Sequence, residues 1–403
     1  MTATRTALVI GAGIAGPVAA MALRKAQIEA TVYEAHPSRA EGIGTFLTIA
    51  SNGLGALQVI GADETALAAG FATPAITLRS TTGKNLGGAR TGLTLPDGTT
   101  SHTLKRADLY QALYEEATRR GIQVEHGKRL TGTQLTSEGV RAVFEDGSHA
   151  TADILIGADG IRSTVRRLID PAAPAPAYIG LLNLGGYARG VQMEAEPGSY
   201  TMIFGKRAFF GYVLAPSREV WWFANVPRGD EPARGEVEAI PPAQWQTRLG
   251  ELYAEDSGPA ARLVQATDTA DIMKASPVHS IPHLPTWHNG RMIVIGDAAH
   301  APTPTSGQGA SLSIEDAVVL AKCLRDLPSP QHAFTRFESL RRPRAERIIK
   351  QAARINSSKA AGPVTRVFRD AALPIVMKMA ASSKQATAAY RYHIDWDAPA
   401  TSA

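Results

Sequence analysis

Three glycines near the start of the chain have a spacing that binds dinucleotides. Gly11, Gly13 and Gly16 form the pattern G-x-G-x-x-G. The first glycine allows a tight turn, the second lets the backbone approach a pyrophosphate, and the third lets a helix pack closely on a strand. Glu34 follows about 20 residues later, where a carboxylate can bind both hydroxyls of a ribose and disfavours a 2′-phosphate. These residues predict a dinucleotide site without distinguishing FAD from NAD.

Two acidic residues elsewhere in the chain follow apolar runs. Asp159 and Gly160 come after the run 154–156, and Asp297 comes after the run 292–295. Ligands of open α/β sheets bind just beyond the carboxyl ends of the parallel strands. Either aspartate alone is typical of a turn or a helix cap. Because all three motifs occur in this order, they indicate one composite nucleotide site.

Together these motifs resemble those of the FAD-dependent aromatic hydroxylases, the single-component flavoprotein monooxygenases that include p-hydroxybenzoate and salicylate hydroxylases. That family has an N-terminal G-x-G-x-x-G, an Asp-Gly pair in mid-chain, and Gly-Asp-Ala-Ala-His followed by proline and Gly-x-Gly, which corresponds here to residues 296–309. The resemblance spans roughly residues 5–325. It implies FAD as the cofactor and NADH or NADPH as a transient reductant, in keeping with the lack of a second nucleotide motif.

The resemblance also implies roles for single residues. Glu34 would bind the adenosine ribose, and Arg106 would contact the flavin. Asp159 would help to hold the diphosphate and is tied to the reduced nicotinamide cofactor, while Asp297 would bind the ribityl chain. The residues expected to bind or line FAD are Gly11, Gly13, Gly16, Glu34, Arg106, Asp159, Asp297, Pro304, Gly307, Gly309 and Ala310.

The ring end of FAD would lie against Pro304 and the backbone from Gly307 to Ala310, where N–H groups at a helix start can stabilise a reduced, anionic flavin. Ala310 departs from one variant of the family, which has a pair ending in Asn, and this departure puts its flavin contact in doubt. His300 is expected to pack or to form a hydrogen bond, with a catalytic base as the alternative.

The activity implied by the resemblance is hydroxylation of an aromatic or polycyclic small molecule. NAD(P)H would reduce FAD, and O2 would form a flavin C4a-hydroperoxide that passes its distal oxygen to an electron-rich carbon. An epoxidase or Baeyer–Villiger-type oxygenase on the same scaffold is an alternative, as is a flavin oxidase or an FAD protein that does not oxygenate. The W-x-W-x-I-P motif of flavin-dependent halogenases is absent, since Trp221-Trp222 does not match it.

The elements that must position these residues predict an α/β fold. The apolar run 7–10, a helix over 17–25 and the run 30–33 form a βαβ unit, the core of a Rossmann-like FAD-binding domain. Aromatic strands between 176 and 228 predict an inserted antiparallel sheet that forms a substrate domain. From residue 311 the pattern is helical, the tail through Trp396 included. The aromatic residues of the sheet that are candidates for substrate contact are Phe204, Phe210, Tyr212 and Trp222.

These elements divide the chain into three units. The FAD-binding domain is expected to be discontinuous, with the substrate domain inserted into it and a helical C-terminal region after it. The expected ranges are 1–72, 101–175 and 285–330 for the FAD-binding domain, 73–100 and 176–284 for the substrate domain, and 331–403 for the C-terminal region.

Other polar residues give no second chemistry. His279 and His283 flank Pro282, which prevents a helical metal-binding pair, so no metal site is expected. Arginines 341–354 are interpreted as a solvated helical face, and without interleaved aromatic residues they do not indicate nucleic-acid binding. Cys323 is the single cysteine, which excludes an intramolecular disulfide.

Composition is compatible with this interpretation. The net charge of +5 is modest for 403 residues and could help to attract an anionic substrate or cofactor. No run reaches the ~18 apolar residues of a transmembrane helix, since charged residues and Pro374 interrupt 363–381. We therefore expect a cytoplasmic enzyme whose partners are a small aromatic substrate and O2, present as a monomer or homodimer. The C-terminal tail would cap the active site or form a dimer contact.

Overall fold

The computed structural model describes residues 4–38, 44–137, 139–359 and 387–401. A six-stranded sheet has the strand order β19-β20-β12-β1-β2-β8. Neighbouring strands from β20 to β8 run parallel, and β19 pairs antiparallel with β20. Its strands come from distant parts of the chain: β1 (Thr6–Ile10), β2 (Glu29–Tyr33), β8 (Gln123–Glu125), β12 (Ile154–Gly157), β19 (His288–Asn289) and β20 (Met292–Val294).

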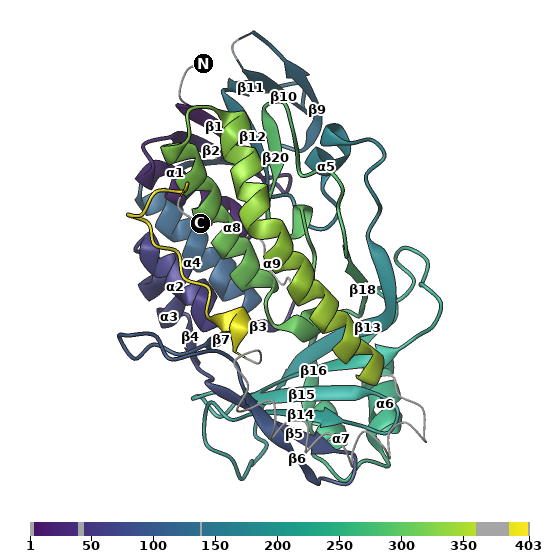
Figure 1. Ribbon diagram of the computed structural model, residues 1–403. Coiled ribbons are helices and arrows are strands. Elements are labelled where there is room, and N and C mark those ends of the chain that lie inside the picture. Colours follow the sequence, from purple (N-terminus) through teal and green to yellow (C-terminus); the bar gives the residue numbers. More distant parts are fainter. Residues whose placement is uncertain (1–3, 39–43, 138, 360–386, 402–403) are drawn as a thin grey trace.

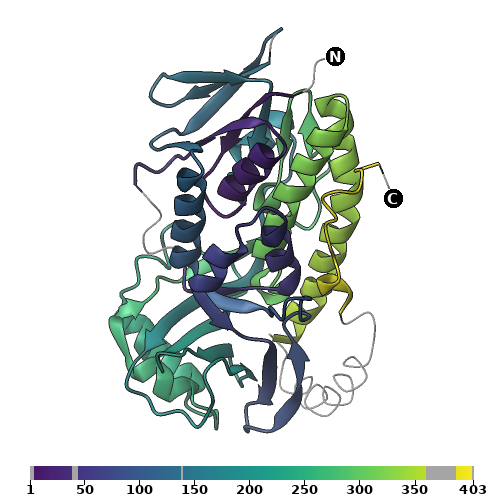
Figure 2. The same ribbon diagram turned by 90° about the vertical axis from the view of Figure 1, so that its left-hand side faces the viewer.

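Helices cover this sheet and explain why its strands are apolar runs. In α1 (Ala15–Lys25) the residues from Ala15 to Leu23 are all buried, and this helix packs against both β2 and α8. Figure 2 shows α8 and α9 side by side along one flank of the molecule. The other helices of this part are α2 (Ser51–Val59), α3 (Asp63–Ala68), α4 (Arg106–Arg119), α5 (Thr164–Ile169), α8 (Gly309–Asp326) and α9 (Pro330–Lys359).

A second, eight-stranded sheet lies at the opposite end of the molecule (Figure 1). Its pairs are antiparallel except for β14 and β5, which run parallel. The order is β17-β13-β16-β15-β14-β5-β6, with β18 also paired to β13. The strands are β5 (Ala75–Ser80), β6 (Asn85–Arg90), β13 (Ala177–Ala188), β14 (Tyr200–Phe204), β15 (Phe209–Leu214), β16 (Val220–Pro227), β17 (Thr267–Ile272) and β18 (Ser276–Ser280).

The two faces of this sheet have different neighbours. One face packs beneath α6 (Pro242–Tyr253) and α7 (Ala260–Gln265), where side chains such as Trp222 and Leu249 form a closed core. The other face, which includes Trp221 and Phe223, packs against Phe46 at the start of β3. Because side chains alternate along a strand, Trp221 and Trp222 lie on opposite faces.

Small elements complete the connection between the two sheets. A three-stranded sheet β3-β7-β4 leads into α4, and a meander β9-β10-β11 packs near β1. Among the described residues, three short 3-10 turns lie in the late chain. The bounds are β3 (Phe46–Ile49), β4 (Gly70–Ala72), β7 (His102–Lys105), β9 (Leu130–Leu135), β10 (Val140–Phe144), β11 (His149–Ala152), η1 (Gly296–Ala298), η2 (Pro304–Ser306) and η3 (Ala388–Tyr390).

The predicted fold class is confirmed: a Rossmann-like parallel sheet, a separate antiparallel sheet and late helices are all present. The domain boundaries stay predictions. Residues 363–381 lie outside the described residues. Among those that are described, no helix has the length and hydropathy needed to cross a membrane.

The helical prediction is wrong for the tail. Beyond η3 the described tail, residues 391–401, contains no helix. It runs along the outer side of α8 and α9 (Figure 1) because its side chains dock on three helices. Trp396 lies between Lys25 of α1 and Arg325 of α8, with the cations 5.5 and 4.5 Å from its ring centre. Ile394 is buried, so the tail is held as an extended strap.

Candidate functional site

The glycine motif forms the turn between β1 and α1, and its three glycines meet three different demands. Gly11 has φ +103°, and a Cβ there would lie 2.5 Å from the Ala158 carbonyl oxygen. A Cβ on Gly16 would collide with the Gly11 carbonyl. A Cβ on Gly13 would meet nothing within 4 Å, so this backbone opens onto free space. The loop therefore offers a bare main chain to a ligand.

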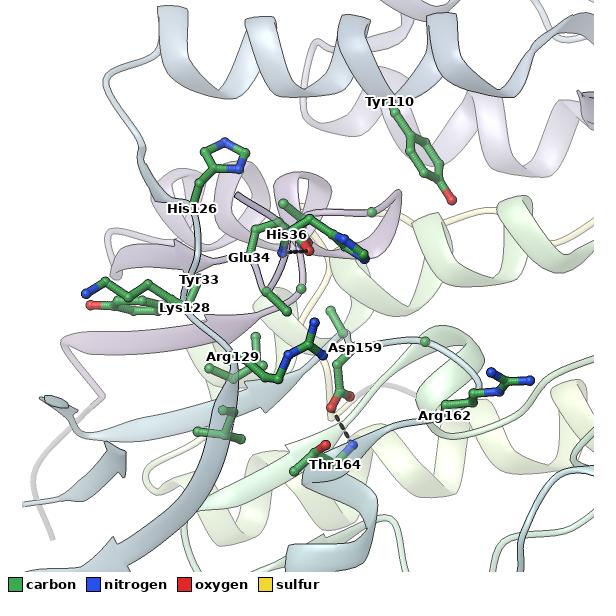
Figure 3. Close-up of a pocket in the computed structure, with 18 of the residues that line it drawn as sticks. Tyr33, Glu34, His36, Tyr110, His126, Lys128, Arg129, Asp159, Arg162 and Thr164 are labelled. Atoms are coloured by element: carbon green, nitrogen blue, oxygen red, sulfur yellow. Dashed lines mark hydrogen bonds between the residues drawn. The ribbon is translucent and has the colours of Figure 1, made fainter. Parts of the chain in front are cut away.

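Glu34 and Asp159 lie beside that loop and line the same cavity, whose volume is about 600 Å³ (Figure 3). The Glu34 carboxylate accepts hydrogen bonds from the Ala12 and His36 amides at 2.7 and 2.9 Å. Asp159 accepts from the amide of Thr164, the first residue of α5, at 2.7 Å. Burial raises the pKa of Asp159, and these hydrogen bonds oppose the rise. Both carboxylates are thus held rigidly at the edge of the parallel sheet.

Arg106 and Asp297 lie close enough, farther along the same edge, for their charges to interact. Arg106 is the first residue of α4, and its Nε donates to the Tyr110 hydroxyl at 2.9 Å. Asp297 lies in η1, directly after the buried strand β20. Burial raises the pKa of Asp297, while the nearby positive charge of Arg106 opposes that rise. The pair thus joins a cation from α4 to an anion from η1.

The loop after η1 carries the residues expected near the flavin ring. Pro304 begins η2, and Gly307 follows with φ +59° and with free space around the position of a Cβ. Gly309 and Ala310 are the first residues of α8. No described side chain caps the first turn of this helix, so its N–H groups are available to an acceptor.

His300 lies beneath this loop. It is 2% exposed, and its Nε2 is 2.6 Å from Asp316 Oδ2. Its amide donates to the Gly296 carbonyl, and its ring lies 5.3 Å from that of Trp287. These contacts favour the packing and hydrogen-bonding role over that of a catalytic base.

FAD fits these residues on structural grounds. The described residues provide no side-chain cap for α1, so its N-terminus, like that of α8, leaves amide donors for an anion. The open position at Gly13 gives a diphosphate room to approach the backbone. Basic side chains from three segments line the same cavity and suit a ligand with two phosphates: Lys128, Arg129, Arg162 and Arg234.

Comparison with known proteins agrees with this geometry. A family model described as "FAD binding domain" matches residues 4–352. The chain belongs to this family of FAD-dependent monooxygenases. It is 28% identical to the aurachin C monooxygenase/isomerase of Stigmatella aurantiaca over 87% of this chain and 88% of that protein. It is 30% identical to the 3-amino-4-hydroxybenzoate 2-monooxygenase of Streptomyces cremeus, covering 86% of each.

A solved structure is similar over most of its length. HpxO of Klebsiella pneumoniae, crystallised with FAD and uric acid, superposes with a TM-score of 0.81 at 25% identity, covering 92% of this chain and 93% of that one. The recognised family and its fold are therefore confirmed, and FAD is the cofactor of this monooxygenase.

The monooxygenase has further cavity residues that sequence reasoning missed. Tyr110 and Tyr114 line the cavity, four and eight positions after Arg106. That spacing puts all three on one face of the predicted helix and could have revealed them. Arg234 lines the cavity from the connection between β16 and α6, and no sequence pattern predicts this position.

The predicted substrate residues of the monooxygenase need a correction. Phe210 and Trp222 stack on each other at 5.6 Å, and both are completely buried in the core beneath α6 and α7, together with Tyr212. Their face of the sheet packs against α6 and α7, and this packing disfavours the three residues as substrate contacts. Phe204 lies on the opposite face, beside Phe209 and Phe223.

Proposed function

We propose that this monooxygenase hydroxylates a planar aromatic or heteroaromatic small molecule, using NADH or NADPH as reductant and O2 as oxidant. The observation that supports this most directly is the aromatic face of the eight-stranded sheet that borders Arg106. The Trp221 ring lies 5.8 Å from Phe46 and 5.9 Å from Tyr187. Such rings offer flat, apolar surfaces on which a planar substrate can stack.

One carbonyl group ties this aromatic face to the flavin side. The Thr45 carbonyl oxygen accepts from the Tyr187 hydroxyl at 2.9 Å and from the Arg106 amide at 3.0 Å. Gly185 lies in β13, the strand that also carries Tyr187. A Cβ on Gly185 would collide with the Thr45 side chain, so a glycine is needed for this close approach. The Thr45 carbonyl therefore holds both the aromatic face, through Tyr187, and the backbone of Arg106, the arginine expected to contact the flavin.

The roles of the side chains follow from this arrangement. Bound FAD, once reduced, supplies the activated oxygen that is transferred to the substrate. Trp221 and Phe223 would orient the ring of the substrate and keep water from the reacting atoms. Burial raises the pKa of Tyr187, so its hydroxyl stays protonated at neutral pH and acts as a donor to Thr45.

The related proteins support a ring-shaped substrate. The Streptomyces relative is named for an aminohydroxybenzoate, and the Klebsiella structure contains uric acid. These compounds share a planar ring with electron-donating substituents, and the aromatic face described above suits that class. Epoxidation, Baeyer–Villiger oxygenation and oxidase chemistry remain the alternatives to be tested.

The test is an assay of the purified, FAD-loaded enzyme with hydroxybenzoates, oxopurines and quinolones. We expect one class to stimulate NADH or NADPH oxidation and to yield a product heavier by one oxygen atom, labelled when 18O2 is supplied. NMR of the product separates ring hydroxylation from a lactone or an epoxide. Hydrogen peroxide formed without any oxygenated product, for every class tried, would contradict the proposal and favour an oxidase.

A further inference from the structure

One arginine of the helical C-terminal region has no exposed surface. Arg341 in α9 was expected on a solvated face, and that expectation is wrong because the helix turns this side chain inward. Its Nη2 is 2.6 Å from the Glu315 carboxylate, and its Nε donates to Asp316 Oδ1 at 2.6 Å. Burying an ion is unfavourable unless the ion is paired, so the positions of these three side chains are strongly constrained.

Asp316 connects Arg341 to the loop that contains Asp297, the aspartate expected to bind the ribityl chain. Its second oxygen, Oδ2, accepts from the Gly296 amide at 2.9 Å and lies 2.6 Å from His300 Nε2. Although burial opposes ionisation, the charges and hydrogen bonds of His300 and Arg341 lower the pKa of Asp316 to about 2. The Asp316 carboxylate therefore contacts both ends of the segment 296–300, and Asp297 lies between these ends.

Glu315 connects Arg341 to the turn 307–310, which is expected to lie at the flavin ring. Its Oε1 accepts from Asn52 Nδ2 at 2.6 Å, and the same amide nitrogen donates to Gln308 Oε1 at 2.9 Å. Glu315, Asn52 and Gln308 are all buried. Gln308 precedes the first residue of α8, so this branch ends where N–H groups are offered to the ring.

The C-terminal strap covers this network. The Tyr392 ring lies over Arg341 at 4.8 Å and over Arg344 at 4.5 Å. Arg344 binds both oxygens of Glu315 and also donates to the Ala389 carbonyl at 2.7 Å. Stacking on a ring shields the guanidinium groups from water, which strengthens their pairing with the two carboxylates.

We propose that Arg341 is a positioning residue for FAD: through two neighbouring carboxylates it sets the spacing between the ribityl-side loop 296–300 and the ring-side turn 307–310. The inference rests on FAD as the cofactor and is independent of the substrate class. A residue that only stabilised the fold would hold α9 to α8. Arg341 also fixes two segments that would contact one ligand.

The first experiment compares R341M with R347M, a matched change on the exposed side of the same helix. The readouts are the Kd of apoprotein for FAD, its Kd for reduced FAD, and the urea midpoint of the apoprotein. Supporting groups behind a bound cofactor typically alter its affinity by about 10- to 100-fold. We expect R341M to weaken FAD binding in that range and to change the ratio of the two Kd values, and R347M to change neither.

R341M leaves two buried carboxylates without their cation and could unfold the protein for that reason alone. Two further variants therefore test the proposal without this complication. The triple variant E315Q/D316N/R341M removes all three charges together, which often preserves folding. N52A severs only the branch to Gln308 and buries no charge. We expect the folded triple variant to bind FAD about 10-fold more weakly than wild type, and N52A to shift the ratio of the Kd values for oxidised and reduced FAD.

The outcomes separate the two roles. If the triple variant is folded and keeps the wild-type Kd for both forms of FAD, the positioning role is overturned. If the triple variant does not fold, N52A decides, and an unchanged Kd ratio in N52A would likewise refute the proposal. R341K, which keeps the charge but not the two-pronged geometry, should recover part of the lost affinity.

Discussion

The six-stranded and the eight-stranded sheet contribute to the site in different ways. At the six-stranded sheet Gly11 and Gly13 bring bare backbone to the cavity and α1 presents its amide groups, next to side chains such as those of Glu34 and Asp159. At the eight-stranded sheet the contribution comes from side chains, namely the rings of Trp221 and Phe223 on one face. We therefore expect FAD binding to depend on backbone geometry, and binding at the proposed substrate site to depend on side chains.

The largest effect is expected at the backbone of the six-stranded sheet. In G13V the new side chain would fill the space in which a diphosphate approaches Gly13, so FAD binding should weaken by about 1,000-fold, or ~4 kcal/mol. Isothermal titration of the apoprotein with FAD measures this. The control is G132V in β9, where a Cβ also meets nothing within 4 Å and the glycine does not line this cavity. Equal losses in both variants would contradict the assignment.

The next effect belongs to the covered face of the eight-stranded sheet. Trp222 is fully buried, stacks on Phe210, and donates its indole N–H to Thr267 Oγ1 at 2.8 Å. W222A should lower the free energy of unfolding by about 3 kcal/mol, because it leaves a cavity and removes the hydrogen bond from the indole to Thr267. FAD affinity under native conditions should stay within twofold. A weakening of FAD binding as large as the loss of stability would erase the contrast between the two sheets.

A smaller effect concerns pH and the carboxylate behind the six-stranded sheet. The pKa of Asp316 is lowered to about 2 in the folded protein, so its ionised form stabilises the fold above pH ~4 and this contribution disappears as pH falls towards 2. It amounts to about 2 kcal/mol. Urea unfolding should therefore show the difference between wild type and D316N shrinking by that amount between pH 5 and pH 2. The exposed change D397N serves as the control, and a constant difference in D316N would contradict the prediction.

The smallest effect is expected on the face of the eight-stranded sheet that carries Trp221 and Phe223. W221F keeps an aromatic ring but loses area and the hydrogen bond from its indole N–H to Glu219 at 2.7 Å. We expect KM for the aromatic substrate to rise by about fivefold, or ~1 kcal/mol, with the Kd for FAD unchanged. W222F, on the covered face, should leave KM unchanged. A larger effect of W222F than of W221F on KM would reverse the assignment of the two faces.

The difference between the sheets also explains what could be predicted from sequence. Gly11, Gly13 and Gly16 serve a backbone geometry that depends on fixed spacing, so a motif finds them without a structure. The run of strands around Trp222 was found as well. The side of the sheet that faces the flavin site could not be predicted. Alternation of side chains along a strand defines two faces, but it does not show which elements pack against each face.

Residues joined by long-range packing were also beyond prediction. Arg341 lies in a segment rich in charge, and the pattern of that segment is typical of a solvated helix. Its burial depends on Glu315 and Asp316, which belong to a different helix. The tail shows the same limit, because Trp396 is fixed by cations from α1 and α8 rather than by its sequence neighbours.

The order of the strands has a consequence for how the protein is made. In the six-stranded sheet β1 pairs with the early strand β2 on one side, but its other neighbour β12, and β20 beyond it, are synthesised much later. Arg341 and the strap emerge later still. A chain leaving the ribosome therefore carries its glycine loop for most of translation before the loops around Asp297 and Gln308 can close on a flavin. We therefore expect stable FAD binding to require a nearly complete chain.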